Sequence, residues 1–169
     1  MPKKDERKPR ILCDTREQKS LCDTFNKNRF DIIIEGLPFG DYFAELPNTD
    51  GTYSQPPICF ERKGFFDLWT TLVPSKSDPD CHERFKRELS RAKKAGFHII
   101  MGIEGSIRDV AKGNIHSMFT GDAMLKKLAM LRVRYDLDVL FFEDRRSMAR
   151  WIEEVFEAVY RNYTKNQAQ

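Results

Sequence analysis

The chain has 169 residues, of which 33% are charged and 40% are hydrophobic. This length fits one domain with a substantial core, and the composition excludes wholesale disorder and a membrane span of about 18 apolar residues. The net charge of +3 comes entirely from residues 1–10, because the remainder of the chain has as many basic as acidic residues. Bulk charge therefore neither indicates nor excludes a nucleic acid as partner.

The N-terminal segment has no secretory character. Residues 1–9 are predicted to be a basic flexible leader, followed by a single domain over residues 10–165. Only three apolar residues follow the leader, too few for a signal peptide. The four cysteines are scattered without a C-x-x-C motif, and Cys81 beside His82 has no second ligand pair for zinc. We therefore expect reduced thiols and an intracellular protein, cytoplasmic or nuclear.

The predicted elements mix strands and helices along the whole chain. Apolar and β-branched runs predict strands over residues 10–15, 30–36, 40–46, 58–63, 97–103 and 139–142. Helical spacing of apolar residues predicts helices over 18–28, 65–72, 82–95, 122–134 and from Ser147 onward, and Ser106 with Asp109 three residues later predicts the capped start of a further short helix. The turn-rich segment 47–51 predicts a hairpin between two of the strands. The fold class is therefore α/β, with a mixed central sheet and helices on both faces.

Three charged residues gather on the predicted hairpin. Asp41 begins its first strand, and Glu61 and Lys63 lie two residues apart in its second strand. Residues two apart in a strand share a face, so Arg62 points to the opposite side. Asp41 and Glu61 can then share a divalent cation, for which Mg²⁺ is suited, beside the ammonium group of Lys63. Such a cation can activate water for attack on a phosphodiester; the alternative is a charged hairpin with solvated ion pairs.

Two further groups of charge flank this cluster. Asp14, Arg16 and Glu17 follow the first buried strand, at the edge where sites of α/β sheets lie. Asp67 comes four residues after Lys63. Each group also has a purely structural explanation, since acidic residues commonly cap a helix or occupy its first turn.

Taken together, these motifs resemble the XPF-type nuclease domain of the PD-(D/E)xK superfamily. That family carries Gly-Asp, a spacer and Glu-Arg-Lys-x-x-x-Asp, which correspond here to Gly40-Asp41 and to residues 61–67. The segment 84–89 is similar to the family's Arg-apolar-x-x-Gln-Leu helix, and the resemblance covers about residues 10–163. It implies a restriction-endonuclease-like fold and a nuclease that cuts flap, fork or other branched DNA with Mg²⁺ or Mn²⁺. It also implies a homodimer or heterodimer and a place in DNA repair or recombination.

The resemblance also implies roles for single residues. Asp41 and Glu61 would be metal ligands, with Asp14 near the metal, and Lys63 would be catalytic. The residues that would shape or support the catalytic site are Arg62, Asp67, Arg16 and Glu17.

The sequence departs from the family pattern in two ways. We find no tandem helix-hairpin-helix module, which leaves junction recognition to a partner or to a compact version of the enzyme. Glu88 stands where the family has glutamine, and His82-Glu83 replaces the usual Asp-Gly. Two alternatives stay open: a catalytically inactive DNA-binding partner subunit, and a PD-(D/E)xK nuclease without structure specificity.

The helix over 82–95 is the best candidate for a DNA contact surface, although such runs often form a solvated face. Its candidate DNA-binding residues are Arg84, Lys86, Arg87, Arg91 and Lys94. His98 is predicted to be a core histidine, and His116 has no partner motif. The last helix carries an apolar stripe that belongs either to the core or to a dimer face, with Trp151, Phe156 and Tyr160 as candidate contacts.

Overall fold

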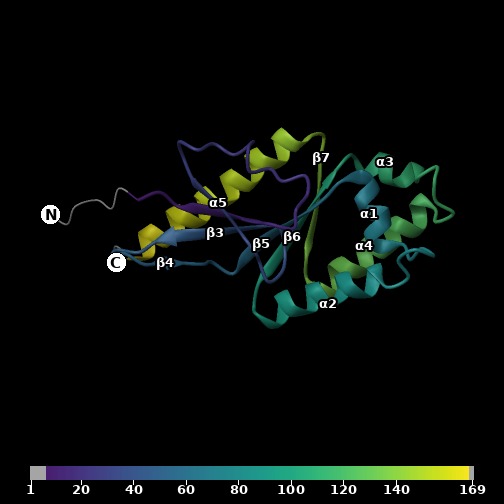
Figure 1. Ribbon diagram of the computed structural model, residues 1–169, viewed down its shortest axis with the longest axis horizontal. Coiled ribbons are helices and arrows are strands. Elements are labelled where there is room, and N and C mark those ends of the chain that lie inside the picture. The colour runs from purple at the N-terminus through teal and green to yellow at the C-terminus, as the bar shows by residue number, and fades with distance from the viewer. Residues whose placement is uncertain (1–6, 168–169) are drawn as a thin grey trace.

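The computed structural model describes residues 7–167 and contains a seven-stranded mixed sheet (Figure 1). The strands follow the order β2-β1-β3-β5-β6-β7, with β4 paired to β3. Parallel pairs join β1 to β2, β5 to β6 and β6 to β7, whereas β3 runs antiparallel to β1, β4 and β5. The strands are β1 (Arg10–Asp14), β2 (Asp31–Glu35), β3 (Tyr42–Pro47), β4 (Tyr53–Ser54), β5 (Ile58–Lys63), β6 (His98–Glu104) and β7 (Asp138–Phe142).

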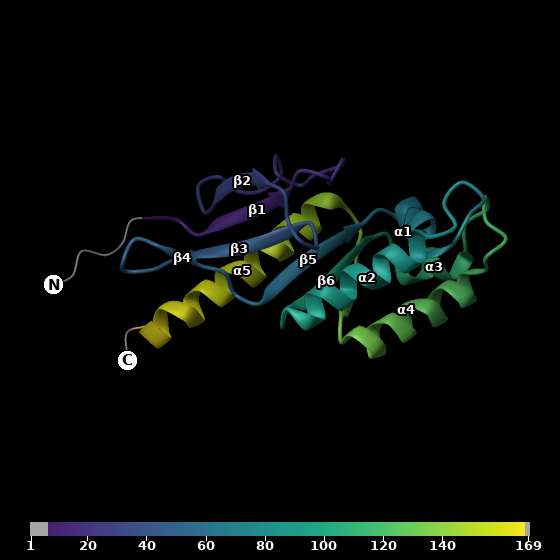
Figure 2. The same cartoon turned by 60° about the horizontal axis from the view of Figure 1, so that its bottom comes forward.

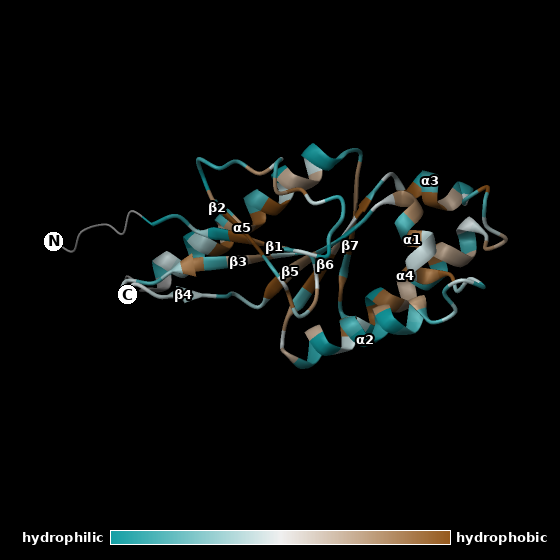
Figure 3. Ribbon diagram, in the orientation of Figure 1, coloured by the Kyte–Doolittle hydropathy of each residue, from teal (hydrophilic) through white to brown (hydrophobic). Residues whose placement is uncertain are grey.

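Helices cover both faces of the sheet, as predicted. The helices are α1 (Phe65–Leu72), α2 (Cys81–Lys94), α3 (Ile107–Lys112), α4 (Gly121–Tyr135) and α5 (Arg145–Gln167). Figure 2 shows α1 to α4 together on one side of the sheet and α5 on the other. Each side has its own hydrophobic cluster, represented by Leu68 and Phe85 on the first and by Ile152 and Phe156 on the second. The hydropathy colouring in Figure 3 shows polar and apolar residues intermixed along these helices, as expected for amphipathic helices at a surface.

The hairpin prediction is confirmed in its pairing and refined in its turn. β3 and β5 pair antiparallel with Tyr42 opposite Phe60, so residue 41 comes beside the end of β5. The turn at residues 47–51, however, connects β3 to the short strand β4, because Asn48 donates its amide to the Thr52 carbonyl. The chain then returns to the sheet as β5.

The predicted helix over 18–28 is wrong, since this segment forms successive turns. Leu21 and Phe25 are nevertheless buried in the cluster under α5. Polar side chains take the amides that a helix would use: the Tyr42 hydroxyl accepts from the Leu21 amide at 2.8 Å, and Glu153 accepts from the Asn26 amide. Side-chain acceptors of this kind compete with helical hydrogen bonds, so the apolar residues reach the core without a helix.

Two local predictions need correction and one is confirmed. Asp144, and not Ser147, caps α5, because its carboxylate accepts the Ser147 amide at 2.7 Å.

His98 is half-exposed at the start of β6 and lies 3.0 Å from Asp138, so it is not a core histidine. The capping box at Ser106, with Asp109 at the third helical position, is present as predicted.

The predicted leader is described only from Arg7 onward, because residues 1–6 lie outside the described residues. Arg7 donates to the carbonyls of Asn48 and Gly51 in the β3–β4 turn. Pro9 is buried and its carbonyl accepts the Asp31 amide at 3.1 Å. Among the helices described, none has both the length and the apolar content needed to cross a membrane.

Candidate active site

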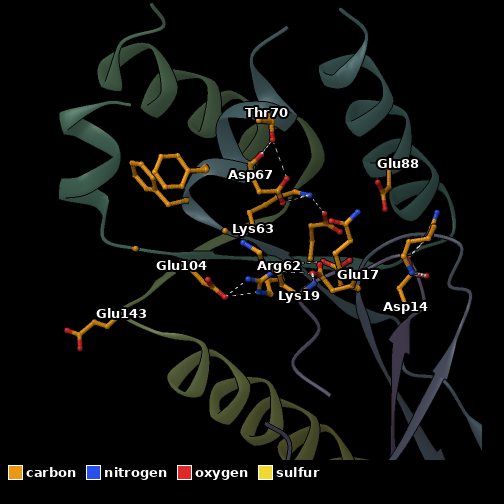
Figure 4. Close-up of a pocket in the computed structure, with 18 residues that line it drawn as sticks. Asp14, Glu17, Lys19, Arg62, Lys63, Asp67, Thr70, Glu88, Glu104 and Glu143 are labelled. Atoms are coloured by element: carbon orange, nitrogen blue, oxygen red, sulfur yellow. Dashed lines mark hydrogen bonds and ion pairs between the residues drawn. The ribbon is translucent and has the colours of Figure 1, made fainter. Parts of the chain in front are cut away.

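A cleft of about 880 Å³ opens at the edge of the sheet where β1, β5 and β6 end (Figure 4). All eight predicted catalytic residues line it, which brings three separate parts of the sequence together: residues 14–17, residue 41 and residues 61–67. Its charged lining residues are Asp14, Arg16, Glu17, Lys19, Asp41, Glu61, Arg62, Lys63, Asp67, Glu88, Glu104 and Glu143.

Backbone contacts fix Asp41 against the end of β5. Its amide donates to the Phe60 carbonyl at 2.8 Å, and its carboxylate accepts the Arg62 amide at 2.7 Å. Gly40 precedes it with a positive φ of 64°, and a Cβ there would lie 3.1 Å from the Phe60 oxygen. Only glycine adopts this turn without strain, which explains the Gly-Asp pair in physical terms.

Glu61 and Lys63 share one face of β5, as strand alternation predicts. The Lys63 Nζ lies 2.6 Å from Glu61 Oε1 and 3.8 Å from Asp67 Oδ2 at the start of α1. It also lies 5.1 Å from the centre of the Phe85 ring of α2, a cation–π distance. The ammonium is therefore held between two carboxylates and an aromatic face.

Burial makes the carboxyl groups of Asp41 and Glu61 costly to ionise. Desolvation raises the pKa of Asp41 well above its usual range, and the nearby charge of Glu61 raises it further. Burial likewise raises the pKa of Glu61 to about 7, against the opposing effect of Lys63. For Lys63, burial works against the charged form, but the charges of Glu61 and Asp67 outweigh it and raise its pKa. The site thus holds more negative charge than Lys63 alone compensates.

This charge imbalance fits a divalent cation. Asp41 and Glu61 supply hard carboxylate oxygens, and Mg²⁺ binds through one or two carboxylates while it retains several waters. Within residues 7–167 no group of three or more His, Cys, Asp or Glu side chains is arranged to hold a metal by itself. Asp41 and Glu61, as two carboxylates, suit an ion that completes its shell with water and substrate oxygens.

Arg62 points away from Glu61 and Lys63 and is only 4% exposed. Its Nε donates to Glu104 at 2.7 Å and its Nη1 donates to Glu17 at 3.1 Å (Figure 4). The guanidinium therefore joins the end of β6 to the segment after β1. A planar donor fork of this kind suits two carboxylates better than a lysine would.

The Asp14 carboxylate, which is buried, is already engaged by neighbours. Arg16 donates to its Oδ2 at 2.7 Å from Nε, and the Leu37 amide donates to its Oδ1 at 3.3 Å. The Asp14 amide donates to the Asp41 carbonyl at 2.9 Å. Asp14 and Arg16 thus support the backbone that carries Asp41.

Glu88 and Glu104 contact groups of the site, although neither was among the predicted site residues. Glu88 of α2 accepts the Gly40 amide at 3.0 Å, and its charge adds to the rise in the pKa of Glu61. Glu104 holds Arg62 from the end of β6. The sequence contained a signal for both: Glu88 replaces the glutamine of the family motif, and Glu104 follows a predicted buried strand that ends at the same edge as β5.

The basic residues of α2 do not share one face. With 3.6 residues per turn, four of them lie on the surface that extends from Glu88 and the cleft, and Arg91 donates to the Pro38 carbonyl at 3.4 Å. The other two lie on a different face: Lys86 pairs with Glu83 at 2.8 Å and lies near Lys127 of α4, and Lys93 donates to the Arg134 carbonyl at 2.9 Å. The candidate DNA-binding residues on the cleft side are Arg84, Arg87, Arg91 and Lys94.

The candidate dimer contacts on α5 separate into buried and accessible residues. Phe156 is fully buried and packs edge-to-face on Phe60 at 5.5 Å, so it belongs to the core. Trp151 is 47% exposed, and Tyr160 is partly buried against the same cluster. Of the three, Trp151 presents the most surface.

The fold and the charged cleft together define an XPF-like nuclease domain. The ERCC4 domain model matches residues 13–155. The chain therefore belongs to the ERCC4 domain family. A comparison with curated protein sequences found no match.

Solved structures agree on the fold. XPF from Aeropyrum pernix is similar with a TM-score of 0.66 and 19% identity, over 94% of this chain and 69% of that one. XPF from the same organism in complex with DNA is similar with a TM-score of 0.62 and 21% identity, over 94% of this chain and 66% of that one. At these identities the likeness concerns the fold alone.

Proposed function

We propose that the chain is a divalent-metal-dependent DNA endonuclease that hydrolyses phosphodiester bonds, with flap, fork or other branched DNA as substrate. The observation that carries the proposal is the half-buried Asp41 and the buried Glu61, which line an open cleft together with Lys63. Carboxylates with raised pKa values beside a charged lysine are typical of catalytic sites. The resemblance to a DNA-bound XPF structure and the cationic surface of α2 favour DNA as the substrate.

Each group has a task in the proposed reaction. Asp41 and Glu61 would hold Mg²⁺, or Mn²⁺ in its place. When bound, the cation supplies neutralising charge for the phosphate and a more acidic water. Lys63 donates hydrogen bonds from its ammonium to the attacking water or to a phosphate oxygen, where negative charge develops in the transition state. Arg62, Asp67, Glu17 and the Asp14–Arg16 pair keep these groups in position.

The test is cleavage of labelled flap, fork and plain duplex DNA by wild type, Asp41→Asn and Lys63→Ala, with and without Mg²⁺. Asp23→Asn is the control, because its exposed carboxylate lies outside the cleft. We expect metal-dependent cutting of the branched substrates by wild type and the control, and a large loss in both cleft variants. DNA binding without cutting by any protein would instead indicate an inactive partner subunit. Equal cutting of duplex and flap would indicate a nuclease without structure specificity.

We further propose that the protein works inside the cell as a homodimer or heterodimer, where it meets its DNA substrate. The half-exposed Trp151 of α5 is the candidate contact for a second nuclease domain. Sedimentation of wild type and Trp151→Ala across the micromolar range tests this. A wild-type monomer at high micromolar concentration excludes the homodimer.

A further inference from the structure

Phe66 is the exposed aromatic residue of the catalytic cleft. It lies on α1, between Lys63 and Asp67 in sequence, and lines the same cleft as Glu61 and Lys63. Its side chain is 62% exposed, whereas Leu68 of the same helix is fully buried. Single apolar residues are common on protein surfaces. The argument therefore depends on where this ring lies and on what holds it.

The ring of Phe66 packs against another aromatic ring of α1. It meets Phe65 edge-to-face, with ring centres 5.4 Å apart and an angle of 86° between the planes. Phe65 in turn packs against the buried Trp69 with ring centres 4.9 Å apart. An exposed aromatic side chain held on a packed aromatic base loses little conformational freedom when a ligand stacks on it.

The cleft is suited to both the phosphate and the base of a nucleotide. Asp41, Glu61 and Lys63 line it together with Phe65 and Phe66, which follow Lys63 by two and three residues. Phe65 and Phe66 carry no polar side-chain atom, so their contact with a base is stacking. Every base allows this contact because each has an aromatic face.

A second hollow adjoins the cleft at Phe65. It has a volume of about 390 Å³ and shares Phe65 and Gly105 with the cleft. Its remaining lining residues are Asp109, Lys112 and Gly113. A strand that passes the catalytic residues thus has room beyond the aromatic pair, where the exposed Lys112, which pairs with Asp109 at 3.5 Å, lies beside its path.

We propose that Phe66 is a substrate-stacking residue, which receives an unpaired base next to the cleaved phosphate. The inference rests on the proposed nuclease function and specifies its substrate: DNA in which a nucleotide beside the cut is unpaired. In an intact duplex each base is already stacked on its neighbours, and its removal costs free energy. The stacking residue therefore favours cutting at junctions, without preference for a base sequence.

The experiment measures kcat/KM of wild type, Phe66→Ala and Phe66→Trp on flap DNA. One substrate carries a normal base at the unpaired position and the other carries an abasic residue. Loss of a stacked base lowers affinity about 5- to 150-fold. We expect Phe66→Ala to lose that factor on the normal flap but little on the abasic flap, and Phe66→Trp to retain activity. Met130→Ala, which removes an exposed apolar side chain of α4 outside the cleft, is the matched control and should behave as wild type.

The outcomes separate this inference from the proposed function. If wild type cuts DNA and Phe66→Ala lowers kcat/KM equally on both substrates, or on neither, Phe66 is not a stacking residue. The proposed nuclease function is unaffected by that result. If Phe66→Ala instead changes the oligomeric state while the ratio of kcat/KM on normal and abasic flaps stays that of wild type, the ring is a contact between protein chains. This result also refutes the inference. If no protein cuts DNA, fluorescence of 2-aminopurine at the unpaired position still tests stacking. Quenching by wild type and Phe66→Trp but not by Phe66→Ala supports it, and equal fluorescence refutes it.

Discussion

Replacing Glu61 with glutamine is expected to stabilise the metal-free protein at alkaline pH while it abolishes cutting. Glu61 is 5% exposed, and burial raises its pKa from 4.5 to about 7 although Lys63 opposes the rise. One pKa unit corresponds to about 1.4 kcal/mol. The ionised carboxylate therefore costs the folded state about 3 kcal/mol at pH 8. Glutamine has nearly the same shape and carries no charge.

The direction of the pH dependence follows from proton binding. The folded state holds the Glu61 proton more tightly than the unfolded chain, so it gains stability from that proton below pH 4.5. This contribution is lost as the pH rises from 4.5 through about 7. The free energy of unfolding of wild type should therefore fall across this range more than that of Glu61→Gln. The two free energies should become equal at acidic pH.

Urea and thermal unfolding with a chelator present, at pH 4.5 and pH 8, measure this difference. For a domain of this size 3 kcal/mol corresponds to a midpoint shift of about 6–12 °C at pH 8. The control Asp23→Asn should stay within about 0.5 kcal/mol of wild type at both values. If Glu61→Gln is equal to or less stable than wild type at pH 8, the reasoning on buried charge is refuted.

Three further predictions concern the supports of the site. Arg62→Ala leaves Glu17 and Glu104 without their shared cation and should cost about 3–5 kcal/mol in urea unfolding; a loss below 1 kcal/mol would contradict this role. Gly40→Ala forces a positive φ on alanine and should cost about 1–2 kcal/mol and lower the cutting rate, and unchanged values for both would refute the backbone argument. Mg²⁺ at 100 times its dissociation constant should stabilise wild type by about 2.7 kcal/mol in calorimetry, and an equal gain in Asp41→Asn would show that the ion binds elsewhere.

The sequence was informative where local patterning and backbone rules act directly. Alternation in β5 placed Glu61 with Lys63 and Arg62 on the opposite side, and the structure has them so. The capping box at Ser106 and the strands of the mixed sheet also followed from local pattern. Helical spacing failed at residues 18–28, because the turns there obtain their hydrogen bonds from side chains far away in sequence.

What the sequence determined by itself is the set of reactive residues and the strand geometry that aligns Asp41, Glu61 and Lys63. Tertiary structure alone decided how these groups are charged and supported. Burial at the meeting point of β1, β3, β5 and α1 raises the pKa of both carboxylates, and this depends on elements from distant parts of the chain. The same packing brings Glu88 to the Gly40 amide and leaves the Phe66 ring open at the rim. Desolvation and long-range contacts have no local signature, so the residue pattern could locate the cleft but could not give its energetics.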